Sequence, residues 1–195
     1  MRAGEGPTIA DVEEGPQLRT ERLLLRRWRP EDSEPFAKMN ADAAVMEFFP
    51  APLSRADSDA MLERIERCFE QHGYGLWAVE IAAERKLAGF TGLQPVEREL
   101  AFAPAVELGW RLSAPCWGRG IATEAASAAA AFVFQALELP QVVAYTAAVN
   151  TRSRRVMERL AMRRDPADDF SHPELPAGHP LAAHVLYRLD ADARR

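Results

Sequence analysis

Hydrophobic positions along the chain follow two different spacings, and the spacing changes in the first half of the sequence. After Ser54, apolar residues recur every three or four positions, which predicts an amphipathic helix. Ser54 and Asp57 stand three residues apart at its start, as in a capping box. Farther along, apolar and polar residues alternate in the ranges 76–81, 87–93 and 106–112. Alternation with period two is typical of strands, so these ranges predict three antiparallel strands in succession.

The remaining apolar segments complete a mixture of helices and strands in one domain. They predict a strand at 23–28, a helix at 30–39, a buried Ala-rich helix at 123–137, a strand at 142–149, a helix at 150–160 that Asn150 caps, and a last strand at 184–189. The loop at 170–180 contains three prolines and is expected to be irregular. Neither an internal repeat nor a linker divides the chain, so we expect a flexible leader at 1–17 and a single domain at 18–195.

Composition narrows the class of protein. The 195 residues are 48% hydrophobic and 27% charged, as expected of a globular domain. The net charge of −5 gives no support for nucleic acid as a partner. No apolar run predicts a signal peptide or a membrane span. The two cysteines and four histidines show no metal-ligand spacing. We therefore expect a cytoplasmic protein with no metal and no membrane contact, either a monomer or a homodimer paired through strand edges.

The strand at 106–112 sends one carboxylate away from the apolar face. Val106 and Leu108 share one face of this strand, whereas Glu107, Gly109 and Arg111 share the other. Glu107 is therefore available for chemistry, or it is a solvated surface carboxylate.

Two glycines follow this strand at the mouth of the buried helix. Backbone N–H groups at a helix N-terminus, aided by the helix dipole, bind anions such as phosphate. The segment lacks the Gly-Lys-Ser/Thr ending of a nucleotide triphosphate loop and the third glycine of a dinucleotide fingerprint. The simpler alternative is that Gly118 and Gly120 only make a turn.

The segment 117–125, Trp-Gly-Arg-Gly-Ile-Ala-Thr-Glu-Ala, resembles the acetyl-coenzyme A pyrophosphate loop of the GNAT acetyltransferases. The similarity is closest to the branch that contains the ribosomal-protein N-terminal acetyltransferases. Further matches lie at 20–23, 107–110 and 150–153, and the resemblance covers about residues 18–189. It implies an α+β GNAT fold, a mixed and mostly antiparallel sheet of about seven strands with helices on both faces.

The chain departs from the family pattern at two places. Trp117 replaces the usual Gln or Arg, which matters little because main-chain amides make those contacts. Ala161 stands where the family commonly has glycine at the end of a helix. If that position requires a positive φ, alanine costs on the order of 1 kcal/mol.

The resemblance implies transfer of acetyl from acetyl-CoA to an amine by direct attack in a ternary complex. Main-chain groups at 110–112 would align the pantetheine arm, and amides at 118–123 would hold the pyrophosphate. The implied cofactor-binding residues are Trp110, Arg111, Leu112, Trp117, Gly118, Arg119, Gly120, Ile121, Ala122, Thr123, Asn150 and Ser153.

Two side chains are candidates for catalysis. Glu107 would act as general base, directly or through water. Ser153 would protonate the departing thiolate, or it is simply a small helix residue. A covalent route through Cys116 is the less favoured alternative. Asp168 and Asp169 are candidates for the edge of the acceptor site, because acidic groups suit an ammonium substrate.

Three arginines closely follow Asn150. Arg152, Arg154 and Arg155 either meet the ribose phosphate or form a solvated basic face.

The acceptor is an amine-bearing small molecule or a peptide N-terminus. The alternatives are a non-catalytic acyl-CoA sensor and an interaction protein that binds no CoA.

Overall fold

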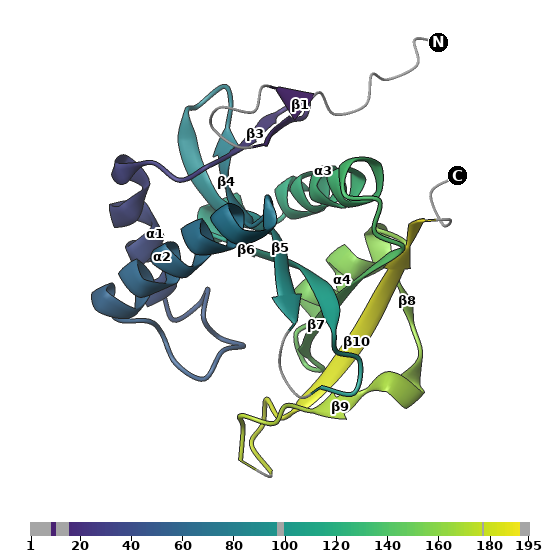
Figure 1. The fold of residues 1–195 in the computed structure, drawn as a ribbon. Helices are drawn as coiled ribbons and strands as arrows, with labels where there is room; N and C mark the ends of the chain where they lie inside the picture. Colours follow the sequence, from purple (N-terminus) through teal and green to yellow (C-terminus); the bar gives the residue numbers. More distant parts are fainter. Residues whose placement is uncertain (1–8, 11–15, 97–99, 177, 192–195) are drawn as a thin grey trace.

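Ten strands form one sheet in the computed structural model, which describes residues 9–10, 16–96, 100–176 and 178–191 (Figure 1). The spatial order is β1-β2-β3-β4-β5-β6-β7-β10-β8, and β9 also pairs with β10. The strands are β1 (Ile9–Ala10), β2 (Gln17–Arg19), β3 (Leu23–Arg26), β4 (Leu76–Ile81), β5 (Lys86–Val96), β6 (Ala105–Leu112), β7 (Gln141–Ala147), β8 (Arg163–Arg164), β9 (Phe170–Ser171) and β10 (Ala183–Asp190). The helices are α1 (Ser33–Ala41), α2 (Arg55–His72), α3 (Ile121–Ala136) and α4 (Thr151–Arg159), with short 3-10 turns at η1 (Pro30–Asp32), η2 (Ala114–Cys116) and η3 (Pro166–Asp168).

Strand pairing confirms the predicted fold class. All described neighbours pair antiparallel except β6 and β7, which are parallel. Three of the ten strands, β1, β8 and β9, have two residues each, which leaves seven longer strands, in agreement with the number that the family resemblance implies. One of the seven, β2, was not predicted from the sequence pattern. Two-residue strands are too short to show a period of two.

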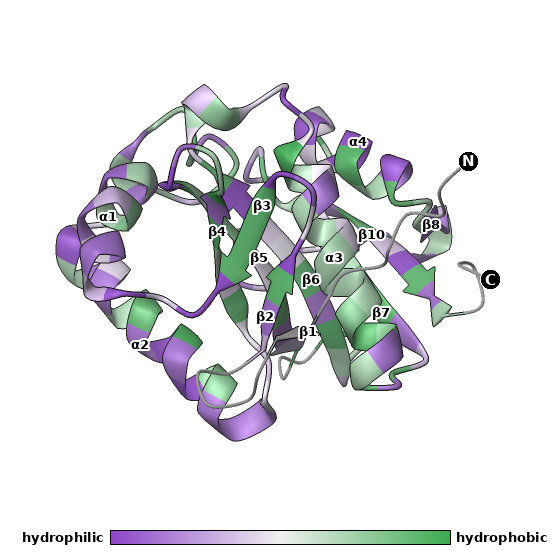
Figure 2. Cartoon of the chain, turned by 90° about the horizontal axis from the view of Figure 1, so that it is seen from above, coloured by the Kyte–Doolittle hydropathy of each residue, from purple (hydrophilic) through white to green (hydrophobic). Residues whose placement is uncertain are grey.

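Helices cover both faces of the sheet. In Figures 1 and 2, α1 and α2 lie on one side of β4 and β5, and the hydrophobic helix α3 lies on the other. Trp77 of β4 is fully buried, and its ring packs edge-on against Phe69 of α2 and Phe132 of α3. One aromatic side chain thus contacts both helical layers. No helix in the described residues is both long and apolar enough to cross a membrane.

Helix starts agree with the sequence wherever a cap was visible in it. The Ser54 hydroxyl accepts from the Asp57 amide, and the Asp57 carboxylate accepts from the Ser54 amide, which completes the predicted capping box. Helix α3 begins at Ile121, two residues earlier than predicted, because Gly120 caps it in a left-handed conformation. The predicted leader 1–17 falls mostly outside the described residues. Of its described part, Ile9–Ala10 forms β1 and pairs with β2, which begins at Gln17, so these residues belong to the sheet and not to a flexible leader.

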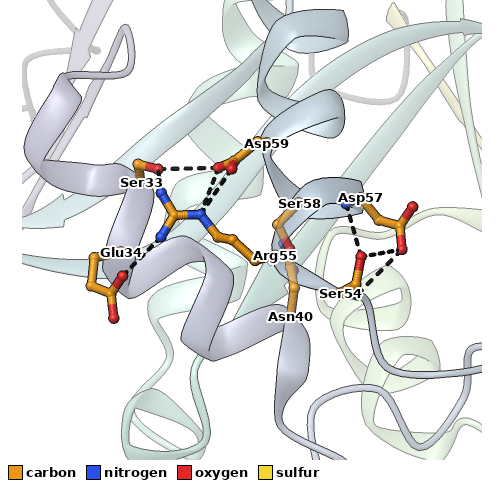
Figure 3. Close-up of polar contacts among 8 residues, drawn as sticks. All are labelled: Ser33, Glu34, Asn40, Ser54, Arg55, Asp57, Ser58 and Asp59. Atoms are coloured by element: carbon orange, nitrogen blue, oxygen red, sulfur yellow. Dashed lines mark hydrogen bonds and ion pairs between the residues drawn. The ribbon is translucent and has the colours of Figure 1, made fainter.

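Polar contacts join α1 to α2 and hold the loop between them (Figure 3). Arg55 pairs with Glu34 of α1 and Asp59 of α2, both at 2.9 Å. Below this exposed bridge, the Asn40 amide nitrogen donates to the Ser58 hydroxyl at 3.3 Å, and both residues are fully buried. These contacts between α1 and α2 fix both ends of the segment 42–54, which borders the cavity described next.

Candidate active site

The sheet opens where β6 and β7 part. The two strands pair at one position, Glu107 with Val143, whereas β6 pairs with β5 along its whole length. The edge of β6 that faces β7 therefore has no ladder partner from Leu108 to Leu112. A cavity of about 650 Å³ extends from this opening to the glycine loop. It is bordered by β6, the segment 116–123, the end of β7, the start of α4, the loop 45–50, and residues 172–175 and 181.

The glycine loop presents main-chain amides to this cavity. Gly118 and Gly120 have φ angles of 72° and 78°, which favour glycine. Gly120 is the N-cap of α3, and no described side chain caps the amides that follow it. The first intrahelical bond of α3 runs from the Glu124 amide to the Gly120 carbonyl. The amides of Ile121, Ala122 and Thr123 thus remain for an anion, and the helix dipole favours one.

A clamp from the start of the domain holds the loop in place. Thr20 Oγ1 donates to the Glu124 carboxylate at 2.5 Å, and Arg22 Nε donates to it at 2.7 Å. A second guanidinium nitrogen of Arg22 bonds to the Arg119 carbonyl at 3.0 Å. Burial raises the pKa of Glu124, but the hydrogen bonds from Thr20 and Arg22 outweigh it, so the net pKa is lowered. Glu124 is therefore a carboxylate at neutral pH. The motif 20–23 thus supports the glycine loop through hydrogen bonds to Glu124 and Arg119, a role that was not predicted from the sequence.

Trp117 closes the wall between the loop and β6. Its indole nitrogen donates to the Leu112 carbonyl at 2.9 Å, so that carbonyl is already occupied. Arg152 stacks over the Trp117 ring at 4.4 Å and pairs with Glu47 at 2.5 Å. The Arg152 guanidinium therefore already has partners in the cavity wall. Arg155, three residues further along α4, lines the cavity and is exposed.

Glu107 lies at the point where the two strands separate, and it lines the cavity. Its carboxylate accepts a hydrogen bond from the Gln94 amide at 2.7 Å, across the β5–β6 pair. The side chain is half-buried. Its place on the polar face of β6 agrees with the predicted alternation, because Leu108 beside it is 1% exposed.

Asn150 and Ser153 both line the cavity at the start of α4. Asn150 Oδ1 accepts from the Ser153 amide at 3.1 Å, which confirms the predicted cap. Asn150 Nδ2 donates to Thr146 Oγ1 at 3.0 Å. Asn150 therefore serves as a cap and borders the cavity at once.

The far end of the cavity carries different acidic and basic groups from those that the sequence suggests. Asp168 pairs with Arg188 and Asp169 pairs with Arg164, and neither aspartate borders the cavity. Glu174, His172 and His184 line it instead, together with Tyr145. Burial lowers the pKa of His184, and His172, whose ring lies 4.8 Å away, adds to the effect, while bonds to the Ala182 and Leu181 main chain oppose it.

Cys116 and possible metal ligands are the other groups to consider at this site. Cys116 is buried and accepts a hydrogen bond from the Ser113 hydroxyl at 3.4 Å. Within the described residues, no three His, Cys, Asp or Glu side chains are grouped as a metal site would require. The loop 45–50 lines the cavity but is not among the predicted site residues. Its consecutive aromatic residues before Pro50 are the signal that marks it.

Comparison with known proteins agrees with this geometry. The sequence model of the acetyltransferase (GNAT) domain matches residues 22–163. A relative from Aspergillus fumigatus, FsC-acetyl coenzyme A-N(2)-transacetylase, is 31% identical over 149 residues, covering 73% of this chain and 63% of the relative. The chain thus spans less than two thirds of that relative.

Solved structures share the fold. An acetyltransferase from Agrobacterium tumefaciens is 26% identical with a TM-score of 0.73, and the match covers 95% of this chain and 99% of that one. A protein from Vibrio cholerae, described as a ribosomal-protein-serine acetyltransferase, is 18% identical with a TM-score of 0.70, covering 89% and 97%. At 18% identity the similarity concerns the fold alone.

Proposed function

This chain belongs to the GNAT acetyltransferase family, and we propose that it transfers acetyl from acetyl-CoA to an amine. The observation that carries the proposal is one continuous cavity. It joins the uncapped amides of α3, the unpaired edge of β6 and the carboxylate of Glu107. These are the parts that a long acyl donor with a pyrophosphate and a reactive end requires.

Acetyl-CoA fits the residues that border this cavity. The amides of the segment 118–123 would hold its pyrophosphate, because two positive-φ glycines bring the main chain close without a side chain between. The unpaired edge of β6 at 110–112 would hydrogen-bond the pantetheine amides. The indole of Trp117 occupies the Leu112 carbonyl, so the other groups of this edge would make those bonds.

In the proposed reaction the acceptor nitrogen attacks the thioester carbonyl carbon while donor and acceptor are both bound. Glu107 takes a proton from the ammonium, directly or through water, which frees the nitrogen lone pair. A main-chain amide of β6 stabilises the tetrahedral oxyanion. The C–S bond then breaks, the attacking nitrogen gives its second proton to solvent, and the Ser153 hydroxyl protonates the thiolate and regains a proton from solvent.

The acceptor class is an amine of a small molecule or of a peptide N-terminus. The A. fumigatus relative is named for N(2)-acetyl transfer, which supports a nitrogen as the acceptor atom. Glu174 and Glu107 border the cavity and suit an ammonium group.

Thermal shift with acetyl-CoA, CoA and ATP tests the proposal, followed by a turnover assay with a mixed panel of amines and peptides. A ligand at a hundredfold excess over its Kd stabilises the fold by about 2.7 kcal/mol. We expect acetyl-CoA and CoA to raise the melting temperature and ATP to leave it unchanged. Tight acetyl-CoA binding without any turnover would support the sensor instead. A response to ATP alone would show that the loop binds another anion.

A further inference from the structure

Arg111 is a half-buried cation that borders the cavity. Its guanidinium stacks over the ring of Phe49 at 4.1 Å and lies 5.3 Å from the ring of Phe90. Nη1 donates to Asn40 Oδ1 at 2.7 Å, and Nε is buried with no hydrogen-bond partner. Its described polar and cation–π contacts are thus one neutral amide and two aromatic rings.

A buried arginine elsewhere in the fold shows which partners Arg111 lacks. Arg26 is 4% exposed and pairs with Asp32 at 2.6 Å and Glu80 at 2.8 Å. No described carboxylate forms an ion pair with Arg111. Burial lowers the pKa of Arg111 to about 10, so the side chain stays charged at neutral pH without a counter-charge. Enclosing an unpaired charge is costly, and a buried donor without a partner adds to the cost. A ligand anion would remove part of this cost.

The position of Arg111 favours the acceptor over the acetyl donor as the source of that anion. Arg111 shares the polar face of β6 with Glu107, and its aromatic neighbour Phe49 belongs to the loop between α1 and α2. The donor's phosphates have their own place at the start of α3, and the pantetheine arm beside β6 carries no charge. An anion at Arg111 would therefore come from a molecule that enters from the Glu107 side.

We propose that Arg111 binds a carboxylate of the acceptor, so that this protein prefers amines that carry a carboxylate elsewhere in the molecule. The inference rests on the proposed function. The planar guanidinium matches a carboxylate in shape and charge. Residues 107 and 111 lie about 13 Å apart along an extended strand, and the cavity holds about 650 Å³, so one molecule can reach both.

Asn40 prepares Arg111 for this role. Asn40 is fully buried, and its amide nitrogen donates to Ser58 (Figure 3). Its amide oxygen accepts from Nη1 of Arg111. The bond occupies one edge of the guanidinium and the stack on Phe49 occupies one face. The rotamer is thereby fixed before any ligand arrives, which reduces the entropy lost on binding.

The test compares acceptors that differ by one carboxylate. ω-Amino acids of increasing length are paired with n-alkylamines of the same carbon chain, and kcat/KM is measured for the wild type, Arg111→Gln and Arg111→Lys. Arg67→Gln is the matched control, because Arg67 is an exposed arginine of α2 outside the cavity. Calorimetric titration of the CoA-loaded proteins with the same pairs gives affinities that do not depend on turnover.

We expect the wild type and Arg67→Gln to favour the amino acid of one chain length by about 10- to 100-fold, the value of a charged hydrogen-bonded pair. Arg111→Gln should lose this preference through KM, so that its kcat/KM values for the amino acid and the alkylamine of each pair become equal. Arg111→Lys should keep part of the preference, because it keeps the charge and loses the planar fork.

Three results would overturn the proposal. Equal affinity of the wild type for both members of every pair would show that no carboxylate is recognised. The side chain would be assigned to packing if two results occur together. In the first, Arg111→Gln loses activity equally toward both members of a pair or fails to fold; in the second, Arg111→Lys keeps the full preference. A reduced acetyl-CoA shift in Arg111→Gln would assign it to the donor. If acetyl-CoA does not bind the wild type at all, the proposed function itself fails, which is a separate outcome.

Discussion

Gly120 joins two requirements at one residue, because it caps α3 and lies where an anion would approach the main chain. Its φ of 78° disfavours any L side chain, and an added Cβ would lie 3.4 Å from Arg22 Nη2. Valine there would also cover the amides of the helix start. We therefore expect Gly120→Val to remain folded and to lose its stabilisation by acetyl-CoA, measured by thermal shift.

Gly73 provides the matched control for this substitution. It has a φ of 72°, caps the end of α2 and has nothing within 4 Å of an added Cβ. Both valine variants should lose about 1–2 kcal/mol of the free energy of unfolding, the cost of a left-handed residue. Only Gly120→Val should lose the acetyl-CoA response. A normal acetyl-CoA shift in a folded Gly120→Val protein would contradict the assignment of the loop.

Glu107 is the residue on which the proposed chemistry depends. If it takes the proton from the acceptor, Glu107→Gln should lower kcat by roughly 10²- to 10⁴-fold and leave the acetyl-CoA shift unchanged. The loss should shrink as pH rises toward the pKa of the amine, because more acceptor is then already neutral. Glu63→Gln, at an exposed glutamate of α2, is the control that should keep full activity.

Two results would remove Glu107 from this role. Nearly full kcat in Glu107→Gln at neutral pH would leave the proton to water or to another group. A loss of acetyl-CoA binding as large as the loss of turnover would make Glu107 a support for β6, in keeping with its bond to Gln94.

At the scale of the elements, local signals in the sequence predicted most of the structure. Alternation located β4 to the residue, and the Ser54 capping box located the start of α2. Both signals depend on neighbours in the chain, which the sequence displays. The clamp of Arg22 on Glu124 joins residues 102 positions apart, so no local pattern contains it. The enclosure of Arg111 by Phe49 and Asn40 was missed for the same reason.

The turn after α4 shows a family departure with a measurable cost. Ala161 has a φ of 58°, the left-handed conformation that the missing glycine would accept without strain. Ala161 is exposed, so its side chain contributes little packing. Ala161→Gly should therefore raise the free energy of unfolding by about 0.5–1 kcal/mol in chemical denaturation.

A helical alanine is the control for this prediction. Ala60 is exposed within α2, where glycine lacks the helical preference of alanine. Ala60→Gly should lower the free energy of unfolding by about 0.5–1 kcal/mol, the opposite sign. A loss in both variants would mean that the turn at Ala161 tolerates alanine without strain.

At the scale of the whole molecule, the sheet is one layer that opens between β6 and β7. The single parallel pair at Glu107 and Val143 follows a crossover through α3, so its register depends on how that helix packs. Sequence alternation predicts both strands but not the point where they part, because the divergence arises from long-range packing. The location of the cavity is therefore a property of the assembled fold.

Amide hydrogen exchange reports separately on the two segments that border this opening, the glycine loop and β6. Acetyl-CoA should slow exchange at 118–123, where the amides would hold the pyrophosphate, and at 108–112, where β6 lacks a partner toward β7. Pantetheine lacks the pyrophosphate, so at saturating concentration it should slow exchange in β6 alone. The paired strands β3 and β4 serve as the internal control, and their exchange should stay the same with either ligand. If acetyl-CoA raises the melting temperature but protects neither segment, it binds elsewhere, and the opening between β6 and β7 is not its site.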